Sequence, residues 1–229
     1  MSPATADRPQ LVFVDGIGGR RVFRRPLLSH FAARGHVCHD VEYRPSRESF
    51  EAIRTRLGDR LTAIAADGPS VLVGYSFGGV LARSVLTTRA DVAPPRRLFL
   101  VASPMRALRM CRTVRGWPPF RWLTGGCGQL LADEPRMQAL GLPAVATTCI
   151  YGTKGYTGPL ALTGRTPNDG MVAIDEADPS RFVDALAVRA THPAIATSHE
   201  VIAAIESRLS VQQATRLTAE INGEKGRLG

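Results

Sequence analysis

Lysine is almost missing from this chain. Of its 29 basic residues, 27 are arginines, and only Lys154 and Lys225 are lysines. With 20 acidic residues the formal net charge is +9. The arginines are scattered and are not interleaved with aromatic residues in any stripe, so no nucleic-acid-binding motif accompanies the charge and we expect no nucleic-acid partner. A weak attraction to anionic membrane surfaces or acidic substrates fits the charge better.

Long hydrophobic runs are absent as well. No apolar stretch approaches the roughly 20 residues of a membrane-spanning helix, and residues 1–10 contain no hydrophobic segment of the signal-peptide type. We therefore expect a cytoplasmic location. A hydrophobic content of 44% over 229 residues is typical of one globular α/β domain. We expect a single domain spanning 1–229, with its core at about 10–209 and a polar, flexible tail at 210–229.

Cysteine is scarce, and its spacing is uninformative. The four cysteines include no Cys-x-x-Cys pair and no nearby ligand spacing, so the sequence predicts no metal site. Cys38 and Cys149 fall within apolar runs and are expected to be small buried hydrophobic residues. Cys111 and Cys127 share one irregular segment, and the sequence does not decide whether they form a disulfide.

Strand-like apolar runs alternate with helix-like segments along the chain. This alternation predicts an α/β fold with a mostly parallel sheet and helices on both faces, and it places ligand chemistry at the carboxyl ends of the strands. The expected strands are 11–15, 37–42, 71–75, 98–102, 144–151 and 182–188, and the expected helices are 22–34, 49–66, 77–88 and 198–209.

Residues 104–143 interrupt the alternation. The segment follows a strand directly, lacks a long regular helical period, and carries both tryptophans of the chain within six residues. One interpretation is an extra core helix with a proline-rich entry. The other is a small lid or acyl-binding wall in which Trp117, Phe120 and Trp122 contact the substrate. The sequence alone leaves both open.

Residues 71–82 read Val-Leu-Val-Gly-Tyr-Ser-Phe-Gly-Gly-Val-Leu-Ala, which is the most informative stretch of the chain. It places Gly74-x-Ser76-x-Gly78 between a strand-like run and a helix-like run. A serine on a sharp strand-to-helix turn projects its hydroxyl out of the sheet, and flanking glycines avoid collisions with the neighbouring backbone. Ser76 is therefore a candidate nucleophile, although a serine that merely caps the following helix is the simpler alternative.

A serine nucleophile needs a base, and the base needs an acid that orients it. In open α/β sheets these residues follow in the order Ser, Asp or Glu, His. Asp169 stands before a glycine after the fifth predicted strand, although an ordinary Asp-Gly turn has the same signature. Two histidines come later. We favour His192, which follows the last predicted strand, over His199, which falls in the first turn of the last helix.

An oxyanion hole requires two backbone N–H groups aimed at the developing negative charge. We expect one from Phe77, directly after the nucleophile, and the other from Ile17, in the glycine-rich loop that ends the first strand. Gly16 lets this backbone approach a ligand closely. Neither Gly-x-Gly-x-x-Gly nor a Walker lysine is present, which argues against a nucleotide site.

These features together resemble the α/β-hydrolases, in particular compact bacterial lipase- and esterase-like members. Residues 168–172 read Asn-Asp-Gly-Met-Val and match the family's late acid motif, and 192–201 are similar to its ending, where the catalytic histidine precedes a closing helix. The resemblance spans roughly residues 10–209. One departure is Asp15-Gly16, where the family usually has His-Gly. We expect the changed local charge at Asp15 to disfavour anionic leaving groups or substrates.

The resemblance implies a serine hydrolase of carboxylic esters that needs no metal or organic cofactor. The expected catalytic residues are Ser76, Asp169 and His192, and the expected substrate is an acyl or lipid-like ester. Tyr75, beside the nucleophile, is expected to contact the substrate. The alternatives are a thioesterase or acyltransferase that uses the same three residues, and a non-catalytic binding protein that keeps the turn only as architecture.

Overall fold

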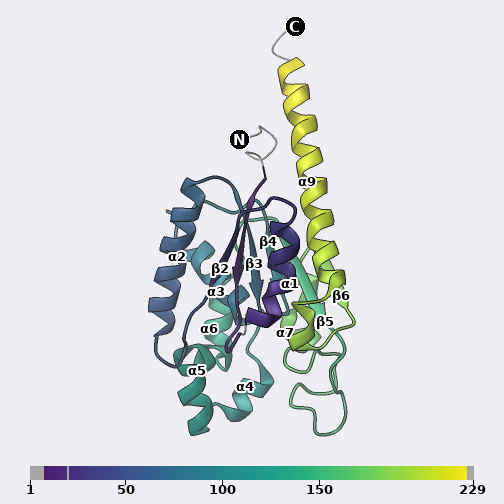
Figure 1. Ribbon diagram of the computed structural model, residues 1–229. Helices are drawn as coiled ribbons and strands as arrows, with labels where there is room; N and C mark the ends of the chain where they lie inside the picture. The colour runs from purple at the N-terminus through teal and green to yellow at the C-terminus, as the bar shows by residue number, and fades with distance from the viewer. Residues whose placement is uncertain (1–7, 20, 226–229) are drawn as a thin grey trace.

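The computed structural model of the protein describes residues 8–19 and 21–225, and it contains one parallel β-sheet (Figure 1). Its six strands lie in the order β2-β1-β3-β4-β5-β6, and every neighbouring pair is parallel. The mostly parallel sheet predicted from the sequence is therefore confirmed. The strands are β1 (Gln10–Val14), β2 (Cys38–Val41), β3 (Ser70–Tyr75), β4 (Leu98–Val101), β5 (Thr147–Gly152) and β6 (Asp184–Val188).

Helices cover both faces of the sheet, as expected. One face packs against α1, α8 and α9, and the opposite face packs against α2 to α7. The helices are α1 (Arg21–Ala32), α2 (Phe50–Ala66), α3 (Phe77–Thr88), α4 (Arg109–Val114), α5 (Pro118–Leu131), α6 (Glu134–Ala139), α7 (Ile174–Ala177), α8 (His192–Ile195) and α9 (His199–Lys225). No helix in the described ranges is both long and apolar enough to cross a membrane.

Two-sided burial explains why the central strands are continuous apolar runs. In β1, Val12 and Val14 belong to the core under α2 and α3, whereas Leu11 and Phe13 belong to the core under α1 and α9. Successive strand residues point to opposite faces, so a strand covered on both sides needs hydrophobic residues at every position.

The strand order places the site. The chain adds β2 on one side of β1 and then returns to add β3 on the other side. Such a reversal opens a crevice at the carboxyl ends of the two strands. Asp15 follows β1 and Ser76 follows β3, so both lie at this crevice.

Residues 104–143 fold into α4, α5 and α6, which the sequence did not resolve as separate helices. Pro118 and Pro119 occupy the first helical positions of α5, where a missing N–H costs nothing. Gly125 then interrupts α5 with a φ of 51°, and a side chain there would collide with the Pro45 carbonyl. A proline start and a mid-helix break together remove the long regular period of a single helix.

The structure also differs at the end of the last helix, and it answers the question about cysteine pairing that the sequence left open. Helix α9 continues to Lys225, beyond residue 209 at which we expected the last helix to end; residues 226–229 of the expected tail lie outside the described residues. All four cysteines are unpaired, Cys111 and Cys127 among them. Burial raises the pKa of the Cys111 and Cys127 thiols to about 12.

Candidate active site

Ser76 occupies a strained turn between β3 and α3. Its φ is 52° and its ψ is −124°, a backbone conformation that residues other than glycine rarely adopt. A Cβ at Gly78 would lie 2.0 Å from the Val14 carbonyl oxygen, and one at Gly74 would lie 2.5 Å from the Gly79 Cα. The hydroxyl of Ser76 makes no capping hydrogen bond to α3. The turn therefore presents the hydroxyl away from the helix, unlike a simple helix cap.

The structure brings Ser76, His192 and Asp169 into one hydrogen-bonded chain. The Ser76 Oγ lies 2.9 Å from the His192 Nε2, and the His192 Nδ1 lies 2.7 Å from the Asp169 Oδ2. Asp169 is only 1% exposed and His192 only 5%. This is the arrangement in which an imidazole can take a proton from a serine while a carboxylate fixes its tautomer. His199, by contrast, is exposed at the start of α9.

The Asp169 carboxylate is fixed by its own loop. Its Oδ1 accepts hydrogen bonds from the amides of Met171 (2.9 Å) and Val172 (2.8 Å), which leaves Oδ2 for the imidazole. Asn168 is fully buried, donates to two loop carbonyls and accepts from the Gly170 amide. Each residue type in the Asn-Asp-Gly-x-Val stretch thus has a structural reason, and Asp169 is not the solvated carboxylate of an ordinary turn.

Tyr75 contacts the base directly. Its hydroxyl donates to the His192 carbonyl oxygen at 2.8 Å, and the two rings lie 5.3 Å apart. Burial raises the pKa of Tyr75, so the hydroxyl stays protonated and remains a donor. The sequence suggested only substrate contact for Tyr75; the structure adds a role in holding His192.

The two backbone amides expected to form the oxyanion hole lie next to the hydrogen-bonded side chains of Ser76, His192 and Asp169. Phe77 is the first residue of α3, where a backbone N–H has no partner within the helix. Neither the Phe77 nor the Ile17 amide donates a hydrogen bond to any residue in the described ranges. Gly16 packs so close that a Cβ there would lie 2.9 Å from the Ser76 Cβ. Both N–H groups are therefore available to an anionic oxygen.

A buried arginine that the sequence analysis missed holds the loop after β1. Arg24 is 2% exposed and pairs with Asp15, Asp40 and Glu42. Asp15 also accepts from the Gly16 amide at 2.7 Å, and Tyr43 donates to the Asp15 carbonyl oxygen at 2.8 Å. Burial raises the pKa of Asp15, against the opposing effects of the Gly16 amide and Arg24.

This network bears on the expectation about Asp15. Asp15 is 5% exposed and its carboxylate pairs with Arg24, which also pairs with Asp40 and Glu42. Arg24 lies nine residues along the chain on α1, and nothing in the local sequence marks it as the partner. A periodicity analysis of α1 could have flagged only that an arginine falls on its buried face.

An apolar cavity of about 240 Å³ opens beside Ser76. Phe120 and Gly16 line it, as expected, but Trp117 and Trp122 do not: they are 60% and 73% exposed. Both face outward because α5 turns its other side to the cavity. Further lining residues that the sequence analysis missed are Leu108, Met110, Cys111, Thr124, Gly128, Leu131, Met171, Val172 and Pro193.

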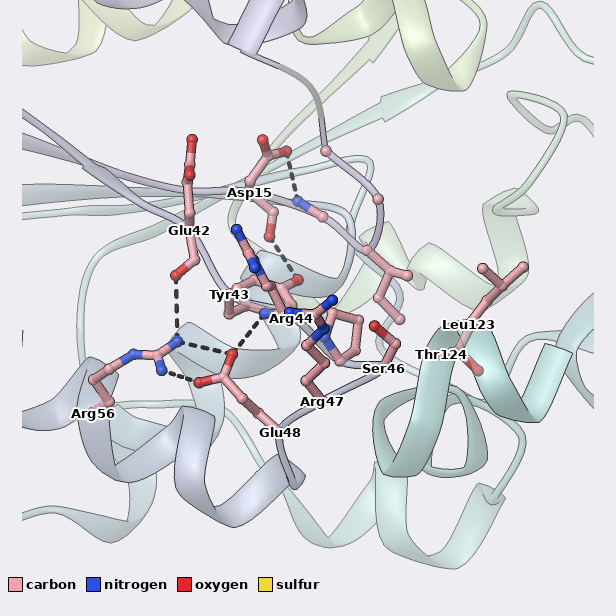
Figure 2. Close-up of a pocket in the computed structure, with 15 residues that line it drawn as sticks. Asp15, Glu42, Tyr43, Arg44, Ser46, Arg47, Glu48, Arg56, Leu123 and Thr124 are labelled. Atoms are coloured by element: carbon pink, nitrogen blue, oxygen red, sulfur yellow. Dashed lines mark hydrogen bonds and ion pairs between the residues drawn. The ribbon is translucent and has the colours of Figure 1, made fainter. Parts of the chain in front are cut away.

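A larger, polar cavity of about 960 Å³ lies across the loop 16–19 (Figure 2). The two cavities share this loop and Thr124. Figure 2 shows Arg44, Ser46 and Arg47 on the segment between β2 and α2, with Leu123 and Thr124 of α5 on the other side.

Three arginines and three acidic residues line this polar cavity: Arg44, Arg47, Arg56, Asp15, Glu42 and Glu48. Its Glu48 is paired with Arg56, whereas the side chains of Arg44 and Arg47 form no ion pair within the described ranges. No group of three or more potential metal ligands exists in the described part of the chain.

No protein-family model matches the sequence, and no curated protein matches it significantly. Solved structures do match. The mature lipase BlEst2 from Bacillus licheniformis has a TM-score of 0.65 at 17% identity, covering 91% of this chain and 93% of that one. The metagenomic carboxyl esterase MGS0156 has a TM-score of 0.63 at 18% identity, with 90% and 76% covered.

A third match is part of a longer protein. The phospholipase PlaB from Legionella pneumophila has a TM-score of 0.60 at 14% identity, over 74% of this chain and 45% of that one. The chain resembles lipases and esterases in its architecture across most of its length, and at these identities the likeness concerns architecture alone. This chain has the α/β-hydrolase fold.

Proposed function

We propose that the protein is a serine hydrolase of carboxylic esters. One observation carries the proposal: Ser76 on a strained turn, His192 and Asp169 form a continuous hydrogen-bonded chain beside two unused backbone amides. A non-catalytic binding protein has no need for the buried Asp169, the oriented imidazole and the exposed hydroxyl together. The lipase and esterase neighbours support the same class.

In the proposed reaction the Ser76 Oγ attacks the acyl carbon while His192 Nε2 takes its proton. Asp169 accepts the Nδ1–H and stabilises the imidazolium. The amides of Ile17 and Phe77 donate to the oxyanion. His192 then protonates the leaving alcohol, and water, deprotonated by the same histidine, releases the acid and restores Ser76. No metal or organic cofactor takes part.

The cavities suggest how the ester is oriented. The apolar cavity, lined by Phe120 and Leu131, would hold the acyl chain, and its 240 Å³ lies below the usual 300–1,000 Å³ of ligand sites, which favours short or medium chains. The polar cavity, with Arg44 and Arg47, would hold the alcohol portion, which favours a polar or phosphate-bearing head group.

The test is hydrolysis of a p-nitrophenyl ester series, from acetate to decanoate, by the purified protein and by Ser76→Ala. We expect activity in the wild type that peaks at short or medium chains. The Ser76→Ala protein should lose it by about three orders of magnitude or more while folding normally. Equal activity in both proteins, or none in the wild type across the series, would contradict the proposal.

A further inference from the structure

Exposed hydrophobic side chains occur on two segments near the apolar cavity. One is residues 112–123, which run from α4 into α5 and include the cavity-lining Phe120; the other is residues 154–165, in the loop after β5, which α4 contacts through Arg109. We call these two segments the mouth rim. Its large exposed side chains, with their exposed fractions, are Trp117 (60%), Trp122 (73%), Leu123 (55%), Tyr156 (65%), Leu160 (89%) and Leu162 (54%).

The two segments of the rim belong to one face. Figure 1 shows α4, α5 and the loop after β5 at the same end of the molecule, where the strands have their carboxyl ends. Arg109 of α4 donates to the Thr163 carbonyl oxygen at 3.5 Å and pairs with Asp175, which ties the loop to the helix. Phe120 on one side and Met171 on the other line the same cavity.

The charge of the rim has one sign. Residues 104–132 contain five arginines and no acidic residue, and residues 153–168 contain two basic residues and no acidic one. Arg106 and Arg109 pair with carboxylates of the neighbouring segment. The remaining basic residues are exposed and form no ion pair within the described ranges; they are Arg112, Arg115, Arg121, Lys154 and Arg165.

Such a surface suits one kind of partner. Tryptophan and tyrosine combine a large apolar ring with a polar tip and favour the boundary between lipid and water. Exposed arginines attract anionic head groups, each contributing about fivefold to binding when it lies near the surface. Two tryptophan rings exposed to water are not stabilised by burial, whereas an anionic bilayer would bury the rings and attract the arginines.

We propose that the mouth rim docks on anionic lipid bilayers, with Trp117 and Trp122 inserted at the level of the head groups. Docking would place the entrance of the apolar cavity against the membrane, so that an ester could pass from the bilayer to Ser76 without crossing water. The delivery of an ester from the bilayer to Ser76 rests on the proposed ester hydrolysis. The docking itself does not require catalysis.

The experiment uses Ser76→Ala protein, so that no hydrolysis product disturbs the membrane. Trp117 and Trp122 are the only tryptophans of the chain, and intrinsic fluorescence therefore reports the proposed contact directly. With phosphatidylcholine vesicles that contain phosphatidylglycerol, we expect a blue shift, quenching by brominated lipid, and weakening by added salt. Pure phosphatidylcholine vesicles should give a much smaller response.

Two double variants separate the charge from the rings. Arg115→Gln/Arg121→Gln should weaken binding to anionic vesicles by up to about 25-fold, at about fivefold per cation. The control Arg54→Gln/Arg60→Gln, on α2, should change it by less than about twofold if this face stays in water. Equal losses in both would overturn the inference, because net charge alone would then explain binding.

Trp117→Ala/Trp122→Ala should lose co-sedimentation with anionic vesicles by about tenfold or more. Val37→Ala/Val183→Ala removes two exposed apolar side chains at the amino ends of β2 and β6, away from the mouth rim. This control variant should still co-sediment with anionic vesicles. Unchanged tryptophan emission of the Ser76→Ala protein with anionic vesicles would overturn the docking. Activity of the wild type on soluble esters, measured separately, shows whether the proposed function stands regardless of this outcome.

Discussion

The cavity beside the triad is small and apolar, whereas the cavity across the loop 16–19 is four times larger and lined by charges. The two share a wall, and the expected oxyanion amide of Ile17 belongs to that wall. The difference follows from the elements that build them. Hydrophobic residues of α4 and α5 form the first cavity, and the polar connection between β2 and α2 forms the second.

Under the proposed function, this contrast gives the ester a direction. An acyl chain gains free energy on leaving water, so it belongs in the apolar cavity. A polar alcohol would lose hydrogen bonds there, but it would find donors at Arg44 and Arg47. The scissile bond would then lie between the two cavities, beside Ser76 and the amides of Ile17 and Phe77.

The largest effect is expected at the base. His192→Ala should reduce kcat/KM by about three orders of magnitude or more, and His199→Ala should leave most activity. The double variant Ser76→Ala/His192→Ala should lose little beyond either single change, because the residues act as a unit. Steady-state kinetics on a soluble ester measures all four proteins. Inactivation by His199→Ala would show that the base has been misassigned.

Asp169→Asn should have the next largest effect, a loss of about 10³–10⁴ in kcat. The Asn oxygen can still accept from the amides of Met171 and Val172, so the loop should keep its fold. Its NH₂ would then face the His192 Nδ1 and force the proton to Nε2, where the imidazole can no longer accept from Ser76. An unchanged melting temperature with this loss supports the tautomer role. A fall in the melting temperature that accompanies the loss of kcat would indicate that Asp169 has a structural role only.

Phe120→Ala tests the acyl side. If Phe120 lines the acyl cavity, KM should rise more for octanoyl than for acetyl esters, since each methylene contributes on the order of 0.8 kcal/mol on burial. Phe182→Ala is the matched control: it is also half-buried against the same core cluster, but at the opposite end of the sheet. Both changes should lower the melting temperature; only Phe120→Ala should alter the dependence on chain length.

The smallest effect is expected on the alcohol side. Arg44→Gln/Arg47→Gln should raise KM by about tenfold for a phosphate-bearing alcohol ester, because a hydrogen bond to a charged group contributes about 1.5–3 kcal/mol. The methyl ester of the same acid should be unaffected. Equal changes for both esters would remove the assignment of the polar cavity to the alcohol.

The sequence predicted the parts of the molecule that local signals encode. All six strands and the helices α1, α2, α3 and α9 were predicted from the alternation of strand-like and helix-like segments. The clearest signals are the continuous apolar runs of β1, β3 and β4, which are buried on both faces. The turn at Ser76 and the loop around Asp169 were recognisable because each needs glycine or asparagine at fixed positions. The hydrogen-bonded chain of Ser76, His192 and Asp169 joins residues picked out from their order along the chain.

What the sequence did not predict depends on contacts between distant residues. Arg24 pairs with three carboxylates, one within β2 and two just after the ends of β1 and β2, and no local pattern marks such a partner. Helix α5 begins with two prolines and breaks at Gly125, so its two faces could not be distinguished by periodicity. For that reason Phe120 and Trp122, two residues apart, looked equivalent, although only Phe120 lines the cavity.

The most direct test of the account is labelling with a fluorophosphonate probe, followed by peptide mapping. The probe reacts with a serine only when a base and an oxyanion hole activate it. We expect one adduct, on Ser76, in the wild type, none on that peptide in Ser76→Ala, and slow labelling in His192→Ala. A folded wild-type protein whose Ser76 stays unlabelled, or labelling that persists in Ser76→Ala, would contradict the claim that this triad is catalytic.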